Sequence, residues 1–173
     1  MSVPPLSVVW LERRAREAIA QEAARRRLRE TGGALFGYES AEEVVVACAF
    51  GPGPNARHGF RSFIPDPEMT RRLISSVRCT SEGRYRFLGS WHTHPGGTAV
   101  PSPADEQTAS DLSGQPGLLL PRPLLLIQAT RRELQTPRLR ELRAWRYPER
   151  GRLAVAEIVP VDLAERHCPS GER

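Results

Sequence analysis

Strand-like and helical segments follow one another irregularly along this chain, and this order most limits the folds open to it. Apolar and β-branched runs, typical of strands, occur at 34–38, 43–50, 60–64, 85–94, 124–129, 139–147 and 153–161. Helical patterns occur at 10–29, at 67–77 and from about residue 102. Because no regular strand–helix–strand repeat links these segments, the sequence predicts an α+β fold rather than a doubly wound one.

The first helical pattern covers residues 10–29, where strong helix formers keep apolar side chains on one face. Gly32 and Gly33 follow, as expected beyond the last turn of a helix. The runs at 34–38 and 43–50 are separated by a short polar turn, which predicts an antiparallel pair. The last two runs are expected to pair with each other and close the sheet.

At 173 residues the chain has the length of one domain, expected over 1–164, followed by a loose tail over 165–173. Its longest apolar stretch, 118–127, is too short for a membrane span and is interrupted by prolines and an arginine. Because the first residues lack the pattern of a secretory signal, we expect a cytoplasmic protein with no membrane partner. The net charge of +5 suits nucleic acid or an acidic protein surface and does not decide between them.

Two histidines separated by one residue, His92 and His94, lie in the strand-like run at 85–94. Side chains two apart in a strand point to the same face, so both imidazoles should project into one site. Asp105 follows after a loop of glycine, proline and small residues that can fold back toward this site. Two imidazoles and one carboxylate, with water in the fourth position, are typical of catalytic zinc. The sequence therefore predicts one zinc ion per chain, bound by His92, His94 and Asp105.

A catalytic site of this kind needs a base that is not itself a ligand, because a proton must leave the attacking water. Glu30 is the candidate, since it stands at the junction between the first helix and the first strand. A negative charge near a helix C-terminus is unfavourable by about 0.3–1 kcal/mol, which hints at a use other than helix stability. His58 and His167 are isolated in a loop and in the tail, and we expect them to be surface residues.

Each of these features also has a purely structural interpretation. Ser102 and Asp105 are placed as the N-cap and the acidic member of a capping box, with Pro103 at the first helical position. The two histidines could be ordinary hydrogen-bonded strand residues. We favour the metal site because two imidazoles on one face, within a short span of an acid, are uncommon without a metal.

The complete set of motifs resembles that of the JAMM metallopeptidases, the catalytically competent branch of the JAB/MPN family. The matching features, in order, are Glu30 before two glycines and an apolar strand, then His92-Thr93-His94-Pro95, then Ser102-Pro103-Ala104-Asp105. Segments 51–55 and 63–66 also resemble bacterial members. The resemblance covers most of the chain, from the first helix to the closing strands.

This resemblance implies a curved mixed β-sheet flanked by helices, and hydrolysis of peptide or isopeptide bonds after the C-terminus of a ubiquitin-like protein. It implies that Glu30 accepts the proton of the zinc-bound water and that Ser102 donates a hydrogen bond to the oxyanion. The implied partners are a ubiquitin-like protein or its conjugate and, in a bacterial conjugation or anti-phage defence system, the activating and conjugating enzymes. The chain has little room for the long insertions with which eukaryotic deubiquitinases grip a second ubiquitin.

Two other functions remain open on the sequence. A metal-free MPN scaffold or interaction module would keep the fold, but such proteins generally lose the ligands that are present here. A RadC-like, DNA-associated JAB protein would suit the basic charge. No helical DNA-binding segment precedes the domain, however, so nucleic acid is not expected as a partner. A zinc nucleobase deaminase is excluded because its His-x-Glu and Pro-Cys-x-x-Cys signature is absent.

Overall fold

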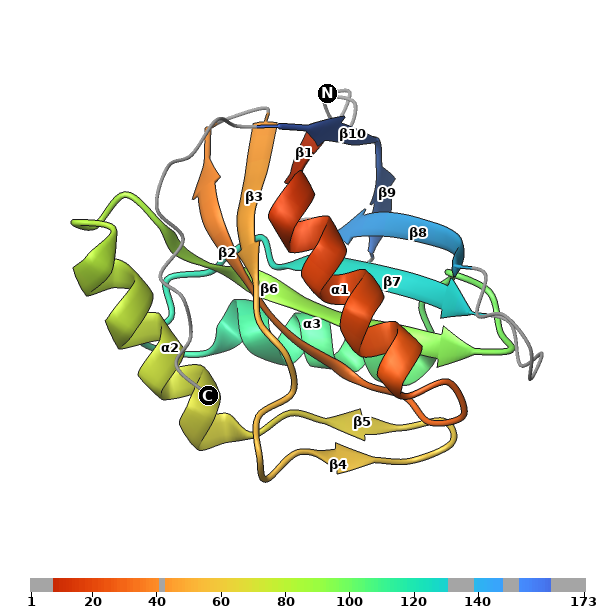
Figure 1. The fold of residues 1–173 in the computed structure, drawn as a ribbon. Helices are drawn as coiled ribbons and strands as arrows, with labels where there is room; N and C mark the ends of the chain where they lie inside the picture. Colours follow the sequence, from red (N-terminus) through yellow and green to blue (C-terminus); the bar gives the residue numbers. More distant parts are fainter. Residues whose placement is uncertain (1–7, 41–42, 131–138, 148–152, 163–173) are drawn as a thin grey trace.

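The computed structural model of the chain describes residues 8–40, 43–130, 139–147 and 153–162. These residues form a mixed sheet with helices on both of its faces and a separate hairpin (Figure 1). The helices are α1 (Arg13–Arg25), α2 (Pro67–Thr80) and α3 (Pro103–Gly114). The strands of the sheet are β1 (Val8–Glu12), β2 (Gly32–Glu39), β3 (Glu43–Ala49), β6 (Arg86–Pro95), β7 (Leu124–Thr130), β8 (Leu139–Arg146), β9 (Ala154–Ala156) and β10 (Ile158–Val161). The hairpin consists of β4 (Arg57–His58) and β5 (Phe63–Ile64).

The main sheet curls until its two edges come close together. Its strand order is β10-β1-β3-β2-β6-β7-β8-β9, so β9 and β10 lie at opposite edges. Glu157 alone separates these two strands in the chain, and one residue spans at most about 3.6 Å. The edges must therefore meet at this point, as Figure 1 shows. The predicted α+β class with a curved mixed sheet is confirmed.

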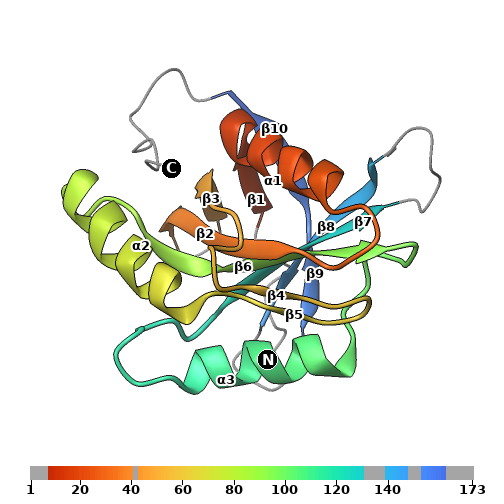
Figure 2. The same ribbon diagram turned by 60° about the horizontal axis from the view of Figure 1, so that its bottom comes forward.

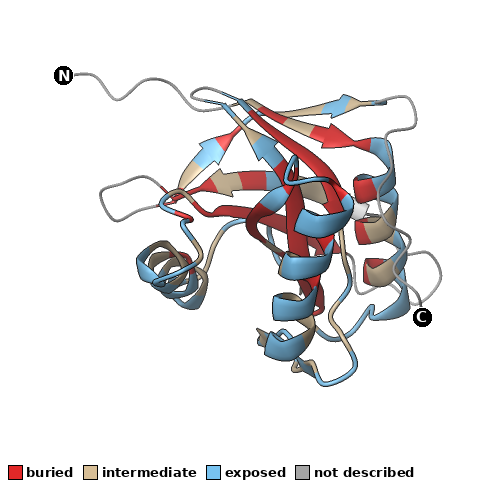
Figure 3. Ribbon diagram, turned by 90° about the vertical axis from the view of Figure 1, so that its left-hand side faces the viewer, coloured by how far each residue is buried: buried red, intermediate tan, exposed pale blue. Residues whose placement is uncertain are grey.

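Two layers of apolar side chains fill the space between the sheet and the helices. On one face, α1 packs against the sheet, and its Ile19 belongs to one apolar cluster with Leu35, Trp91 and Leu126. On the other face, α2 covers a cluster around Phe36, and α3 covers a separate cluster. Figure 2 shows α1 and α3 on opposite sides of the sheet, and Figure 3 shows buried residues concentrated in the strands. None of the helices in the described segments combines the length and the apolar character of a membrane span.

The start of the chain differs from the prediction. Residues 10–12 belong to β1, not to a helix, because β1 pairs in parallel with both β3 and β10, and its Val9 and Leu11 join the apolar cluster under α1. Tertiary pairing here outweighs helix propensity. Helix α1 begins at Arg13, where the carboxylate of Glu12 accepts a hydrogen bond from the Arg14 N–H at 2.7 Å. It ends at Arg25, and the glycines expected after its last turn lie inside β2.

The remaining predictions were confirmed in part. β2 and β3 form the predicted antiparallel pair, β7 is the predicted buried strand, and α2 covers the predicted helix at 67–77. The run at 153–161 splits, because β9 pairs with β8 whereas β10 crosses to β1. Only Phe63–Ile64 of the run at 60–64 is a strand. The predicted tail at 165–173 lies outside the described residues.

Candidate metal centre

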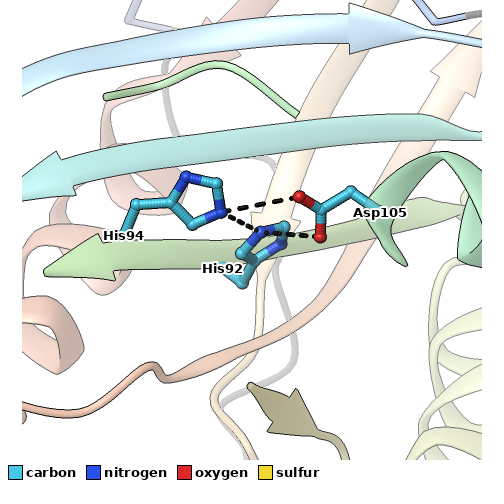
Figure 4. A group of neighbouring side chains, drawn as sticks. All are labelled: His92, His94 and Asp105. Atoms are coloured by element: carbon cyan, nitrogen blue, oxygen red, sulfur yellow. Dashed lines mark hydrogen bonds and ion pairs between the residues drawn. The ribbon is translucent and has the colours of Figure 1, made fainter. Parts of the chain in front are cut away.

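Strand β6 carries the two histidines into the centre of the sheet, between β2 and β7. His92 and His94 point to the face covered by α3, and their Nε2 atoms lie 2.9 Å apart (Figure 4). The intervening Thr93 and the preceding Trp91 are both buried, and Trp91 belongs to the apolar cluster on the α1 face of the sheet. The Trp91 indole N–H donates to the Phe50 carbonyl at 2.9 Å, which ties β6 to the segment that follows β3.

Asp105 reaches the histidines from the first turn of α3. Its Oδ1 lies 3.2 Å from Nε2 of His92, and its Oδ2 lies 3.5 Å from Nε2 of His94. Ser102 is the N-cap, and the predicted capping box is present, with the Ser102 N–H donating to Asp105 Oδ2 at 2.6 Å. The structural and metal interpretations of Ser102 and Asp105 are therefore compatible, because the cap fixes the helix start that presents the carboxylate.

The spacing of these three side chains fits a tetrahedral metal site. Their ligand atoms all lie within 4.8 Å of one another. Bonds of about 2.0–2.2 Å to a tetrahedral zinc place neighbouring ligand atoms about 3.3–3.6 Å apart, close to the separations of 2.9, 3.2 and 3.5 Å found here. The Nδ1–H of His94 donates to the Thr98 carbonyl at 2.8 Å, so its Nε2 lone pair is free to face the site.

The electrostatics of the cluster favour a charged carboxylate beside the imidazoles. Burial alone would raise the pKa of Asp105, but hydrogen bonds and attraction from His92 and His94 hold it well below its usual range. Burial likewise acts to lower the pKa of His94, yet its hydrogen bonds to Asp105 and to the Thr98 carbonyl raise it above its ordinary value. The site therefore holds negative charge that a cation can compensate.

Glu30 lies in the loop between α1 and β2, at the predicted junction, and is half-buried. Burial raises the pKa of its carboxyl, His92 and His94 lower it by attraction, and Asp105 raises it by repulsion. The net result is a pKa above the ordinary 4.5. Glu30 lies outside the group of candidate ligands but close enough to interact electrostatically with all three of them. This is the environment that a general base beside a metal requires.

The predicted site residues all line one cavity of about 640 Å³. The polar part is formed by Glu30, His92, His94, Ser102 and Asp105. From there the cavity continues between β6, α3 and the β4–β5 hairpin (residues 57–64), where its lining is largely apolar. The hairpin lies on the same side of the sheet as α3 (Figure 2).

Gly32, the first residue of β2, lets this strand approach β6, which carries His92 and His94. Gly32 is paired with His92, and a Cβ at position 32 would lie 2.2 Å from the Trp91 carbonyl oxygen and 2.9 Å from Cβ of His92. Any side chain here would push β2 away from β6. A glycine is therefore needed at this position for Glu30, just upstream, to reach the histidines.

One residue near the site was misjudged from the sequence. His58 belongs to β4, is half-buried, and its Nδ1 lies 2.9 Å from the Glu30 carbonyl oxygen. The expectation that it is a surface residue in a loop is therefore wrong. An isolated histidine among glycines and arginines carries no local signal of this contact, because its partner is 28 positions away in the chain.

Comparisons with known proteins agree with this geometry. Residues 12–147 match the family described as prokaryotic homologs of the JAB domain. A relative from Sinorhizobium fredii, the probable metalloprotease y4qB, is 30% identical over 122 residues, which cover 69% of this chain and 74% of that protein. The solution structure of protein DSY2949 from Desulfitobacterium hafniense has a TM-score of 0.66 at 21% identity, covering 92% of this chain and 97% of that one. It shows the same fold. By the family match and this relative, the chain belongs to the prokaryotic JAB-domain family.

Proposed function

We propose that this protein is a zinc-dependent peptidase or isopeptidase that hydrolyses the bond after the C-terminus of a ubiquitin-like modifier. The observation that carries the proposal is the convergence of His92, His94 and Asp105 within 4.8 Å, in a cavity shared with Glu30 and Ser102. The name of the Sinorhizobium fredii relative, a probable metalloprotease, supports the same class of reaction. A metal-free scaffold would have no need of this arrangement.

The residues that line the cavity have different proposed roles in hydrolysis. His92, His94 and Asp105 would hold the metal. A zinc ion there would lower the pKa of a bound water toward about 7 and would polarise the substrate carbonyl. Glu30 accepts the proton of the attacking water and later donates it to the departing amine. In the metal-free site burial raises the pKa of this carboxyl, which favours uptake of a proton.

Ser102 is the proposed donor to the oxyanion. Its hydroxyl donates to Asp105 Oδ2 at 2.8 Å and lines the cavity. Rotation of this hydroxyl toward a bound carbonyl would redirect the same hydrogen to the developing negative charge. A donor of this kind contributes about 2.7–4 kcal/mol to transition-state stabilisation in comparable sites.

The shape of the cavity supports a peptide substrate. Its volume of about 640 Å³ and its apolar lining can accept an extended chain with apolar side chains. Phe60 and Val100, 60% and 49% exposed, stand at its rim and offer apolar surface to a tail that enters. A ubiquitin-like protein with a flexible C-terminal tail is the proposed substrate. Activating and conjugating enzymes of a bacterial conjugation or defence system are the proposed neighbours.

The test combines metal analysis with cleavage of a ubiquitin-like fusion protein, with and without a chelator. We expect about one zinc per chain and cleavage that stops on chelation and returns on addition of zinc. Asp105→Asn should lose zinc and activity, whereas Asp111→Asn, an exposed carboxylate on the same helix, should retain both. A protein that binds no zinc and cleaves no fusion after zinc is added would favour the scaffold function instead.

A further inference from the structure

The β4–β5 hairpin holds both backbone polar groups of Glu30. The Glu30 N–H donates to the Gly59 carbonyl at 2.8 Å, and the Glu30 carbonyl accepts from Nδ1 of His58 at 2.9 Å. Two consecutive hairpin residues therefore fix the peptide units on both sides of Glu30. The side chain of Glu30 is left to point into the cavity.

The residues on either side of Glu30 are also fixed. Thr31 is bound to β6, because its N–H donates to Oγ1 of Thr93 at 3.0 Å and its carbonyl accepts from the Thr93 N–H at 2.8 Å. Arg29 donates from Nη1 to the His58 carbonyl at 3.1 Å, and its guanidinium lies 5.2 Å from the centre of the Phe60 ring. The segment carrying Glu30 is thus held between the hairpin and the strand of His92 and His94.

His58 can make its contact only with a proton on Nδ1, because a carbonyl oxygen accepts and cannot donate. Both the neutral Nδ1–H form and the imidazolium satisfy this requirement. The ring also packs against Phe63, with centroids 5.5 Å apart, which limits its rotation. The hydrogen bond to Glu30 therefore persists whether or not the ring is charged.

We propose that His58 is a positioning residue for the catalytic base, acting through the main chain of Glu30. The inference rests on the proposed function, in which Glu30 is that base. His58 is absent from the lining of the cavity, so it does not act by contacting the substrate. Without the Nδ1–H donor, the Glu30 carbonyl loses its partner, and the Glu30–Thr31 peptide unit keeps the bond from the Thr31 N–H to Thr93 Oγ1 but is held less firmly. The carboxylate then spends less time in the orientation that accepts the proton.

Three variants test this role through activity. His58→Ala should lower kcat about tenfold, the size expected for one lost hydrogen bond, with KM and zinc content unchanged. His58→Asn should keep kcat near the wild-type value, because its side-chain amide can donate from nearly the same position. Ile64→Ala is the matched control, since Ile64 lies on the same hairpin, is 55% exposed and does not line the cavity. It should leave kcat unchanged.

A second set of measurements, by NMR and hydrogen exchange, does not depend on enzymatic activity. Nitrogen NMR of the histidine side chains should find Nδ1 of His58 protonated. Hydrogen exchange at the Thr31 amide, which belongs to the same peptide unit as the Glu30 carbonyl, should accelerate about tenfold in His58→Ala but not in Ile64→Ala. A wild-type protein that cleaves no fusion would refute the proposed function. The NMR and exchange measurements would still test whether His58 holds the main chain at Glu30. The inference is overturned if Nδ1 carries no proton or if His58→Ala keeps wild-type exchange at the Thr31 amide. It is also overturned if His58→Asn loses as much kcat as His58→Ala, since packing alone would then account for the effect.

Discussion

Replacement of Glu30 by glutamine removes the proposed base and leaves the shape of the site almost unchanged. General-base catalysis contributes about 10²–10⁴-fold, equivalent to about 2.7–5.4 kcal/mol of barrier. We expect the upper part of this range for Glu30→Gln, because among the described residues lining the cavity Asp105 is the other carboxylate, and it is a proposed ligand. Zinc content should stay at the wild-type level, since Glu30 lies outside the ligand group.

The assay is cleavage of a ubiquitin-like fusion under single-turnover conditions, with elemental analysis of the same samples. Glu17→Gln is the matched control, because Glu17 is exposed on α1, lies 3.9 Å from Nη1 of Arg13 and does not line the cavity. A Glu30→Gln protein that keeps zinc and cleaves within threefold of wild type would show that another group is the base. A Glu30→Gln protein that loses zinc would show that Glu30 is a ligand.

Four further predictions follow from the same geometry. His92→Ala should lose both zinc and cleavage, measured by elemental analysis and the fusion assay. Ser102→Ala should lower kcat about 10²–10³-fold with zinc retained, and denaturant titration should show a loss of about 0.5–2 kcal/mol because the α3 cap is gone. Gly32→Ala should lose about 1–3 kcal/mol of stability by thermal unfolding, since its Cβ would meet the Trp91 carbonyl. In the metal-free protein the Glu30 carboxyl should titrate above pH 4.5, because burial raises its pKa; carboxyl NMR should show this titration, and the signal should be absent in Glu30→Gln.

Those parts of the site that depend on a short sequence pattern, such as strand alternation or a helix cap, were predictable from the sequence. His92 and His94 share a face because a strand alternates, and Asp105 is presented by a capping box readable in four consecutive residues. Helix α2 was equally readable, since Leu73 and Val77 recur at helical spacing and are buried.

The parts that depend on distant segments were not predictable. Residues 10–12 have helix formers around them, and only the parallel partners β3 and β10 make them a strand. The pairing of β10 with β1, at the opposite edge of the sheet from β9, likewise has no local sequence signal, because it depends on the position of β1 in the folded sheet. The contact between His58 and Glu30 joins two segments that the sequence alone leaves unrelated.

The one-residue link between β9 and β10 has a consequence for how the protein is made. β1 is synthesised early, yet the partner for its outer edge, β10, is the final strand of the described chain. Until that strand leaves the ribosome, β1 presents unpaired backbone groups to which another chain can add. The strands of the metal centre, β2, β6 and β7, are adjacent in the sheet and do not wait for this event. A chain cut before Ile158 would thus build the candidate metal site and keep a permanently open edge, which makes it prone to aggregate.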